Sequence, residues 1–426
     1  TGEVNVEEMN VEACIELMRK QCQEKDYKST RLYQDDNFLR RLAELCGNIP
    51  LAMCIAGYRV KDFDDPDEVL QNLEKQPMKF LKYPKTHQFV YGAIKMSYEK
   101  CTGEEKETLI RLSVFSGSFS EGAARAVIEK DNLGTTDILK TLVRLSLIKE
   151  PLGHRYSFHL LIKHFLLEQQ NGGDEKAERA KAQATRAELL MVNYYLKLGH
   201  DLTTKSYSKD GYKESREALK KEGHNIQNVL KICSQQGDST TFDSCLAGSQ
   251  IYTSSARHFS LFVRTIIPSS IVDEFLQRCA NMAEKKKQHA FKINFLCLLA
   301  DQERIKSLRG VKSDFDVKMK EIRREFETRY EDLKKDKSLC AHYYYQYGRY
   351  LLRKSEHEEE KSSRLKLQVC PHEQLEKSLR LRQESAKTPV EIADMVYSLL
   401  QLGNSCKKIA TTEFHFQNTK KSKDAS

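Results

Sequence analysis

Hydrophobic positions recur along most of this chain at the spacing of amphipathic helices. Val11, Cys14, Ile15 and Met18 follow the i, i+3, i+4, i+7 pattern, which predicts a helix near the start of the chain. A second helix is expected over residues 37–45. A third, over residues 313–335, carries a long apolar stripe among charged residues, and a coiled coil is the weaker alternative there. The pattern predicts a mainly α chain.

Residues 87–170 depart from the purely helical pattern. Helices are expected over residues 104–114 and 121–128, with Ser120 as the N-cap of the second, and over a third segment that begins at Thr136. Two short β-like runs follow, residues 147–148 and 156–158, joined by Gly153 and His154. Three helices followed by a small hairpin predict a winged helix.

The longest stretch without a charged residue is LCGNIPLAMCIAGY, residues 45–58. Gly47 is suited to end the preceding helix in the left-handed conformation. Pro50 is suited to the first turn of the next helix, where its missing N–H costs nothing. The stretch therefore predicts a helix–turn–helix corner, and a buried structural corner is the plain interpretation. The acidic run at residues 62–65 is expected to start the following helix rather than to bind calcium.

Composition narrows the function classes. The 12 Cys form no C-x-x-C pair, which argues against zinc ribbons and thioredoxin-like chemistry and is typical of reduced thiols in a cytosolic protein. The net charge of +9 is dispersed, so nucleic-acid binding is the minority interpretation. No apolar run is long enough for a membrane span. The sequence has no Gly-Lys dipeptide and hence no phosphate-binding loop, so we expect no ATP hydrolysis and no other enzyme activity from this chain.

The corner and the winged helix carry a family resemblance. Gly-x-x-Pro-Leu-Ala, formed by Gly47, Pro50, Leu51 and Ala52, resembles the "GLPLA" motif of NB-ARC nucleotide switches, the signalling ATPases of plant resistance proteins and the apoptosome scaffold. Residues 112–115 with Phe119 resemble the "LSVF…F" helix of that family, and residues 158–161 resemble its "MHDL" segment.

The resemblance implies specific residue functions. Pro50 would pack on the adenine of bound ADP or ATP, and His159 would meet the β-phosphate of ADP. Gly47, Leu51, Ala52 and Phe158 would support these two positions. Leu160 stands where the family has Asp, which departs from the family's switch geometry. Without the resemblance, His159 would be an ordinary histidine of the wing.

The C-terminal half is expected to form helical hairpins. Tyr344-x-x-Tyr347-Gly348-x-x-Leu351 and Leu399-x-x-Leu402-Gly403-x-x-Cys406 resemble first helices of tetratricopeptide repeats, in which Gly allows close helix packing. The expected divisions are a helical lobe (1–86), a winged helix (87–170), a linker (171–185), a helical region (186–285), repeats (286–412) and a disordered tail (413–426).

The whole pattern is typical of the regulatory and protein-interaction part of an ADP/ATP-dependent signalling switch, with the repeats as the partner-binding sensor. By resemblance, the parent would carry a P-loop domain upstream, bind ADP or ATP, form nucleotide-dependent homo-oligomers and serve innate-immune or cell-death signalling in the cytoplasm, away from membranes. No nucleotide is expected to bind tightly to this chain alone. The alternative is a winged-helix transcription regulator, against which the third helix offers only Lys140 and Arg144 as cations.

Overall fold

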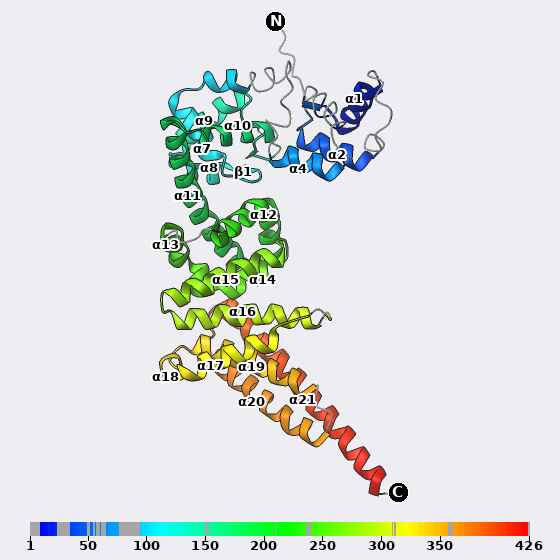
Figure 1. Ribbon diagram of the computed structural model, residues 1–426. Helices are drawn as coiled ribbons and strands as arrows, with labels where there is room; N and C mark the ends of the chain where they lie inside the picture. Colours follow the sequence, from blue (N-terminus) through cyan, green and yellow to red (C-terminus); the bar gives the residue numbers. More distant parts are fainter. Residues whose placement is uncertain are drawn as a thin grey trace. The chain divides into compact units, whose positions relative to one another are not determined.

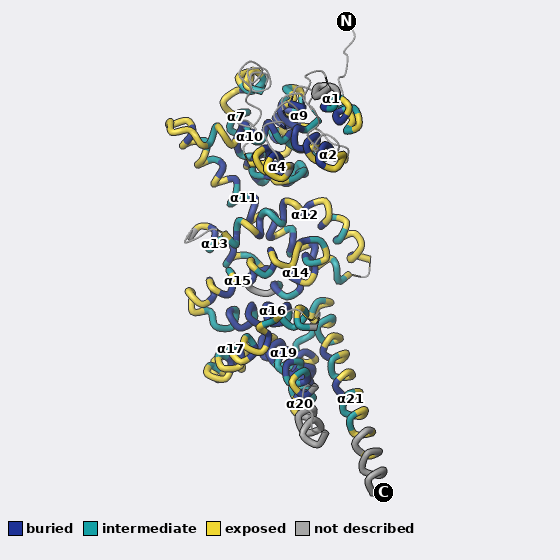
Figure 2. Tube along the Cα trace, turned by 45° about the vertical axis from the view of Figure 1, so that its right-hand side comes forward, coloured by how far each residue is buried: buried dark blue, intermediate teal, exposed yellow. Residues whose placement is uncertain are grey.

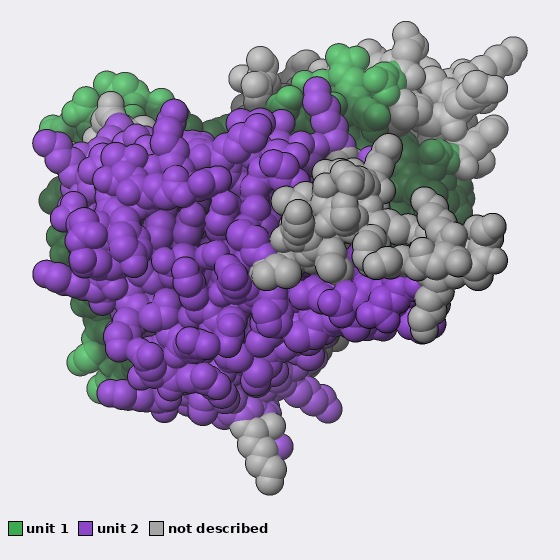
Figure 3. Space-filling view, turned by 90° about the horizontal axis from the view of Figure 1, so that it is seen from below, with its two compact units in different colours: residues 1–191 green, residues 192–426 purple. Residues whose placement is uncertain are grey.

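A computed structural model of the chain is shown in Figure 1. It describes residues 9–23, 35–48, 52–53, 56, 60, 65–75, 94–149, 153–208, 210–235, 240–308, 310, 312–356 and 361–424. Pro50, Leu51 and the segment around Pro84 lie outside the described residues. The chain divides into two compact units, Thr1–Met191 and Val192–Ser426, which are coloured separately in Figure 3.

The fold is mainly α, as the sequence predicts. In the part of the chain that the structure describes, the only sheet has two short strands. The elements of the first unit are α1 (Val11–Gln23), α2 (Asp36–Leu45), α4 (Pro66–Lys75), α7 (Gly103–Leu112), β1 (Phe119–Ser120), α8 (Glu121–Ile128), α9 (Asn132–Arg144), β2 (Arg155–Tyr156) and α10 (Leu160–Gln170).

The helical lobe consists of α1, α2 and α4, which lie together in Figure 1. The side chain of Asp35 accepts hydrogen bonds from the first amides of α2, so an acidic N-cap fixes where this helix begins. Asp65 accepts from the amide of Asp67 and in the same way starts α4, as the acidic run predicts. The apolar faces of these helices form one core, which includes Cys14, Ile15, Met18, Phe38, Leu39, Leu42, Ala52 and Val69.

The winged helix begins with α7, whose N-terminus is closed by a capping box between Thr102 and Glu105. Ser120 caps α8 as predicted, because its hydroxyl accepts from the amide of Ala123 at 3.2 Å. The third helix starts earlier than expected. Asp131, not Thr136, is its N-cap, because a carboxylate directly before Asn132 reaches the amide of Gly134 at 2.7 Å.

The predicted hairpin is only partly correct. Lys149 and Ser157 form a single antiparallel bridge, whereas β2 pairs with β1 in the register Phe119–Tyr156 and Ser120–Arg155. Aromatic packing explains the choice of partner. The Phe119 ring stacks on Phe115, with centroids 4.4 Å apart, and lies 6.1 Å from the Tyr156 ring. The small sheet is thus held over the core of the winged helix.

Helix α11 (Glu175–Lys205) starts in the first unit and ends in the second. The expected linker over residues 171–185 is therefore mostly helix, and Asp174 caps it by accepting from the amide of Ala177. The second unit continues with α12 (Gly211–Gln235), α13 (Thr240–Gly248), the π-helical turn η2 (Ile251–Ser255), α14 (Ala256–Val263), α15 (Ser269–Lys285), α16 (His289–Leu308), α17 (Phe315–Thr328), α18 (Tyr330–Leu333), α19 (Lys337–Glu356), α20 (Lys361–Ser385) and α21 (Pro389–Asp424). The predicted helical hairpins are present, since α15 packs on α16, α19 on α20, and α20 on α21.

Two predictions for the last helix are wrong. The tail expected to be disordered from residue 413 is helical to Asp424, because α21 continues through it. Gly403 was expected at a close helix contact, yet a Cβ built there meets no atom within 4 Å. Gly348, its counterpart in α19, does lie at such a contact, since a Cβ there would come within 2.8 Å of Leu375 in α20.

Helix α21 carries several exposed apolar side chains, most of them in its first half. Figure 2 shows that most of this helix is exposed or only half-buried. The exposed apolar side chains on it are Ile392, Val396, Tyr397, Leu399, Leu400 and Phe414. Several recur three or four residues apart, the spacing of one helical face. Among the described helices, none is long and apolar enough to cross a membrane.

Candidate functional site

The corner at the end of α2 has the conformation that its glycine predicts. Gly47 has φ of +63°, and Asn48 has φ of +56°. The amide of Asn48 donates to the carbonyl of Ala43 at 3.1 Å, and the amide of Gly47 donates to that of Glu44 at 2.9 Å. This pair of bonds is a Schellman motif, which ends the helix and leaves the Gly47 carbonyl free to face a neighbour.

His159 is that neighbour. It is the N-cap of α10, and its Nδ1 accepts the amide of Leu161 at 3.2 Å. Because Nδ1 is an acceptor, the ring proton of the neutral imidazole sits on Nε2. Nε2 lies 3.1 Å from the Gly47 carbonyl oxygen and therefore donates to it. One side chain thus caps a helix of the winged helix and holds the end of a helix in the lobe.

Steric fit supports the same contact. A Cβ added to Gly47 would lie 1.8 Å from His159 Nε2 and 2.1 Å from its Cε1. Only glycine leaves room for the imidazole at this point, and glycine is also the residue that accepts the positive φ. We call the contact between Gly47 and His159 the clasp.

The two residues after His159 extend the clasp with apolar packing. Leu161 is fully buried and belongs to the core of the helical lobe, although it lies in α10. Leu160 is partly buried against the same core. An apolar residue at position 160, where the NB-ARC pattern has Asp, therefore has a local reason. It faces the lobe core, where an unpaired carboxylate would be costly.

Burial keeps the clasp histidine neutral. Only 9% of His159 is exposed, and this burial lowers the pKa of its imidazole. The bond to the Gly47 carbonyl acts in the opposite direction, and the nearby Lys149 ammonium lowers the pKa a little further. Protonation would also turn Nδ1 into a donor that faces the amide of Leu161. The neutral form is thus the one that fits both partners.

Of the remaining motif residues, two are described by the structure and two are not. Ala52 is fully buried in the lobe core, and Phe158 is half-buried with its ring 6.1 Å from Phe119. Their support of the nucleotide site stays a prediction. The position of Pro50 relative to His159 stays a prediction, since Pro50 and Leu51 lie outside the described residues. Sequence reasoning missed the packing of Leu161, although its place two residues after an N-cap could have suggested it.

Of the comparisons with known proteins, only the comparison with solved structures found a match. No protein-family model matches the chain, and no curated protein matches it significantly. Among solved structures, the chain is similar to a Signal Transduction ATPase with Numerous Domains (STAND) protein with a tetratricopeptide repeat sensor from Pyrococcus horikoshii. The alignment has 14% identity and a TM-score of 0.30, and it covers 99% of this chain and 62% of that one. The chain thus spans less than two thirds of the length of the protein it matches.

Metal chemistry has no visible site. In the described ranges, no three His, Cys, Asp or Glu side chains are grouped so that they could hold a metal ion. The thiols of Cys14 and Cys46 are buried and weakly reactive, because burial raises the pKa of both. What the site offers chemically is one neutral imidazole with a single N–H, positioned where two substructures meet.

Proposed function

We propose that this chain is the regulatory part of an ADP/ATP-dependent signalling switch. The observation that carries the proposal is the hydrogen bond between His159 Nε2 and the Gly47 carbonyl. It joins the two segments whose sequences resemble NB-ARC motifs, 112 residues apart in the chain. A switch needs an element with two arrangements that a ligand can bias. The lobe and the winged helix, closed on each other through the clasp, would be that element.

The proposed action rests on the single donor of His159. Its Nδ1 already accepts a hydrogen bond from the amide of Leu161 in α10, so only Nε2–H can donate to a different acceptor in each state of the switch. In the parent protein, a phosphate oxygen of ADP would take this donor while Pro50 packs on the adenine. ADP would then hold the lobe against the winged helix. Exchange for ATP would release the contact and permit oligomerisation.

The second unit would supply the sensor in this proposal. Helical repeats stack into surfaces that bind proteins, and the exposed apolar side chains of α21 are chemically suited to such contacts. We also propose a cytoplasmic protein of the innate-immune or cell-death type without enzymatic activity of its own. The DNA-binding alternative gains no support from α9. Its cations Lys140 and Arg144 line the same surface pocket as the carboxylate of Asp137, which would repel a phosphate backbone.

The test uses the longer parent protein loaded with labelled ADP. His159→Ala should speed ADP dissociation and raise basal signalling, because it removes the donor. His164→Ala is the matched control, since it changes a histidine one turn further along α10. An ADP dissociation rate that His159→Ala leaves unchanged would rule out the nucleotide contact.

A further inference from the structure

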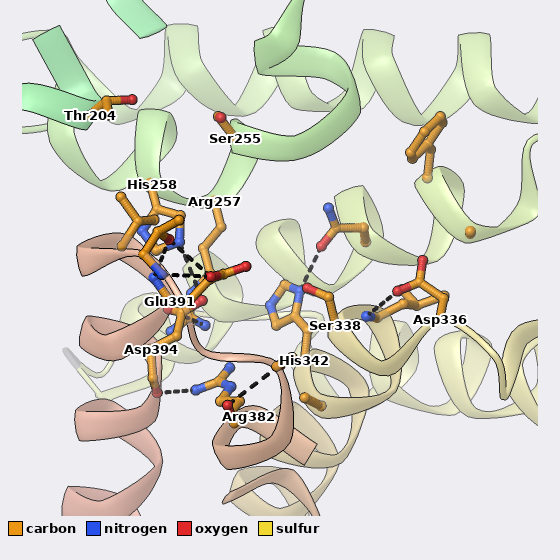
Figure 4. Close-up of a pocket in the computed structure, with 18 of the residues that line it drawn as sticks. Thr204, Ser255, Arg257, His258, Asp336, Ser338, His342, Arg382, Glu391 and Asp394 are labelled. Carbon is orange, nitrogen blue, oxygen red and sulfur yellow. Dashed lines mark hydrogen bonds and ion pairs between the residues drawn. The ribbon is translucent and has the colours of Figure 1, made fainter. Parts of the chain in front are cut away.

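Helix α21 is attached to the rest of the second unit along one polar side. The carboxylate of Asp394 lies 2.8 Å from Arg257 and 3.3 Å from His258 of α14, and Figure 4 shows these three side chains converging. Arg382 of α20 donates to the backbone carbonyl of Asp394 and to the hydroxyl of Ser398, which is fully buried. These contacts fix the rotation of the helix about its own axis, and so they decide which of its sides stays exposed.

A second side of α21 carries a regular exposed stripe, which we call the seam. It consists of six residues, all of them exposed: Ile392, Val396, Leu399, Gly403, Cys406 and Ala410. They follow one another at spacings of 4, 3, 4, 3 and 4 residues. This is the 3.5-residue repeat with which two α-helices pack along their length in a coiled coil. The seam therefore has the pattern of a helix that pairs with another helix.

The seam changes in side-chain size at its middle. Its first three residues are branched aliphatic residues, and its last three are glycine, cysteine and alanine. A Cβ built at Gly403 meets no atom within 4 Å, so no described neighbour in the same copy requires a glycine there. A stripe with this order of sizes is complementary to the same stripe running in the opposite direction. A pairing centred on residue 401 brings three large residues opposite three small ones of the second copy: Ile392 opposite Ala410, Val396 opposite Cys406, and Leu399 opposite Gly403.

The area of the seam sets the strength of such a pair. From residue 392 to residue 410 the helix is about 27 Å long, at a rise of about 1.5 Å per residue. A helix about 10 Å wide then offers a few hundred Å² per copy, less than the roughly 800 Å² per partner of a standard stable interface. Glu391 and, from the second copy, Glu413 come to nearly the same level, which weakens the pair further. A weak and reversible dimer is therefore expected.

We propose that α21 pairs with α21 of a second copy of this chain, seam against seam and antiparallel, about a two-fold axis near residue 401. A two-fold axis uses the same surface on both copies, so a single stripe must be complementary to itself. The order of large and small residues meets this condition only in the antiparallel direction, which the opposed helix dipoles also favour. The inference names a partner for exposed apolar side chains that the proposed function leaves open, and it rests neither on the clasp nor on a nucleotide.

The first test measures the mass of the full 426-residue chain by sedimentation equilibrium, without nucleotide, from low to several hundred micromolar. A monomer–dimer equilibrium with a micromolar dissociation constant is expected. Val396→Lys should raise this constant roughly tenfold or more, because each dimer would bury two unpaired ammonium groups. Val317→Lys is the matched control, since Val317 is also exposed but lies in α17. Both changes replace exposed side chains, so both variants should fold.

Two results of this first test would overturn the proposal. A chain that stays monomeric at every concentration would show that the seam is not a site for a second copy and is left to some other helix. A dissociation constant that Val396→Lys and Val317→Lys change equally would show that the copies meet elsewhere. His159→Ala should leave the constant unchanged, so failure of the switch and failure of the dimer are separate results.

The second test examines the direction of the pair by cross-linking. In the antiparallel pair the two Cys406 residues are about 15 Å apart along the helix axis, whereas position 396 of one copy faces Cys406 of the other. Val396→Cys should therefore form an intermolecular disulfide with Cys406 when glutathione disulfide is added as the oxidant. The further change Cys406→Ser should abolish this cross-link. A disulfide between the two Cys406 residues in the wild-type dimer would show a parallel pair and overturn the antiparallel assignment.

Discussion

Replacing Gly47 by alanine should open the clasp, and the structure allows the size of the effect to be worked out. The change has two separable costs. At φ of +63° a non-glycine residue must adopt the left-handed conformation, which costs about 1–2 kcal/mol. The new Cβ would also lie 1.8 Å from His159 Nε2, so the imidazole must leave and its bond to the Gly47 carbonyl is lost, about 1 kcal/mol or more.

A double-mutant cycle separates these two costs. Gly47→Ala alone should destabilise the closed lobe by about 2–4 kcal/mol. In a His159→Ala background, the steric cost disappears and only the backbone cost of about 1–2 kcal/mol remains. The expected coupling energy is therefore about 1–2 kcal/mol. Gly153→Ala is a matched control, because Gly153 has φ of +86° and no atom within 4 Å of its built Cβ.

Hydrogen exchange of the full chain, followed by mass spectrometry, is the suitable assay. Peptides that cover α2 and the first turn of α10 report opening of the clasp, and peptides from the second unit serve as an internal reference. A coupling of 1–2 kcal/mol corresponds to roughly a 5- to 30-fold change in the opening equilibrium. If the two substitutions prove additive within about 0.3–0.5 kcal/mol, the steric and hydrogen-bond reasoning at this contact is refuted.

Three further predictions concern the same structural features. His159→Ala should lower the free energy of unfolding by about 2 kcal/mol, since it removes both an N-cap and the clasp bond. His159→Asn keeps a good N-cap and should lower it by about half as much. Equal decreases in urea unfolding would contradict this separation of the cap from the clasp bond. Burial lowers the pKa of His159, so its contribution to stability is present above the ordinary histidine pKa of about 6.5 and is lost as pH falls toward the lower folded-state pKa. Hydrogen exchange of α10 should therefore rise on acidification in the wild type, but less in His159→Asn. The same pH profile in both proteins would show that His159 is not the titrating group. Gly348→Ala should destabilise the second unit by about 1–3 kcal/mol, because the new Cβ would contact Leu375. Gly403→Ala, whose Cβ would meet no atom, should stabilise α21 by up to about 1 kcal/mol. A shift of the unfolding temperature in the same direction for both variants would contradict the effect of the close contact at Gly348.

Local signals in the sequence were sufficient for much of the fold. Helix periodicity, the acidic cap at Asp65 and the glycine at position 47 each act within a few residues, so their structural effects can be predicted without knowing the fold. The clasp was predicted only in part. Resemblance selected Gly47 and His159, but nothing local indicates that the imidazole of one meets the carbonyl of the other.

One error is local, and the others arise where distant packing decides. Thr136 is a good N-cap residue, yet Asp131 lies at the position from which the helix amides can be reached. Gly403 stands in the same local pattern as Gly348, but only Gly348 has a helix packed over it. The buried ion pairs of the second unit, Arg257 with Asp394 and Arg349 with Asp301, were missed for the same reason, because each joins two helices that share no sequence motif.

The most direct test of the proposed switch compares amide exchange in the parent protein bound to ADP and bound to ATP. The peptides to follow cover residues 36–48 and 156–170, which meet at the clasp. The account predicts strong protection of both with ADP and a joint loss of protection with ATP. Equal protection in the two nucleotide states would contradict the claim that nucleotide exchange opens the contact between the lobe and the winged helix.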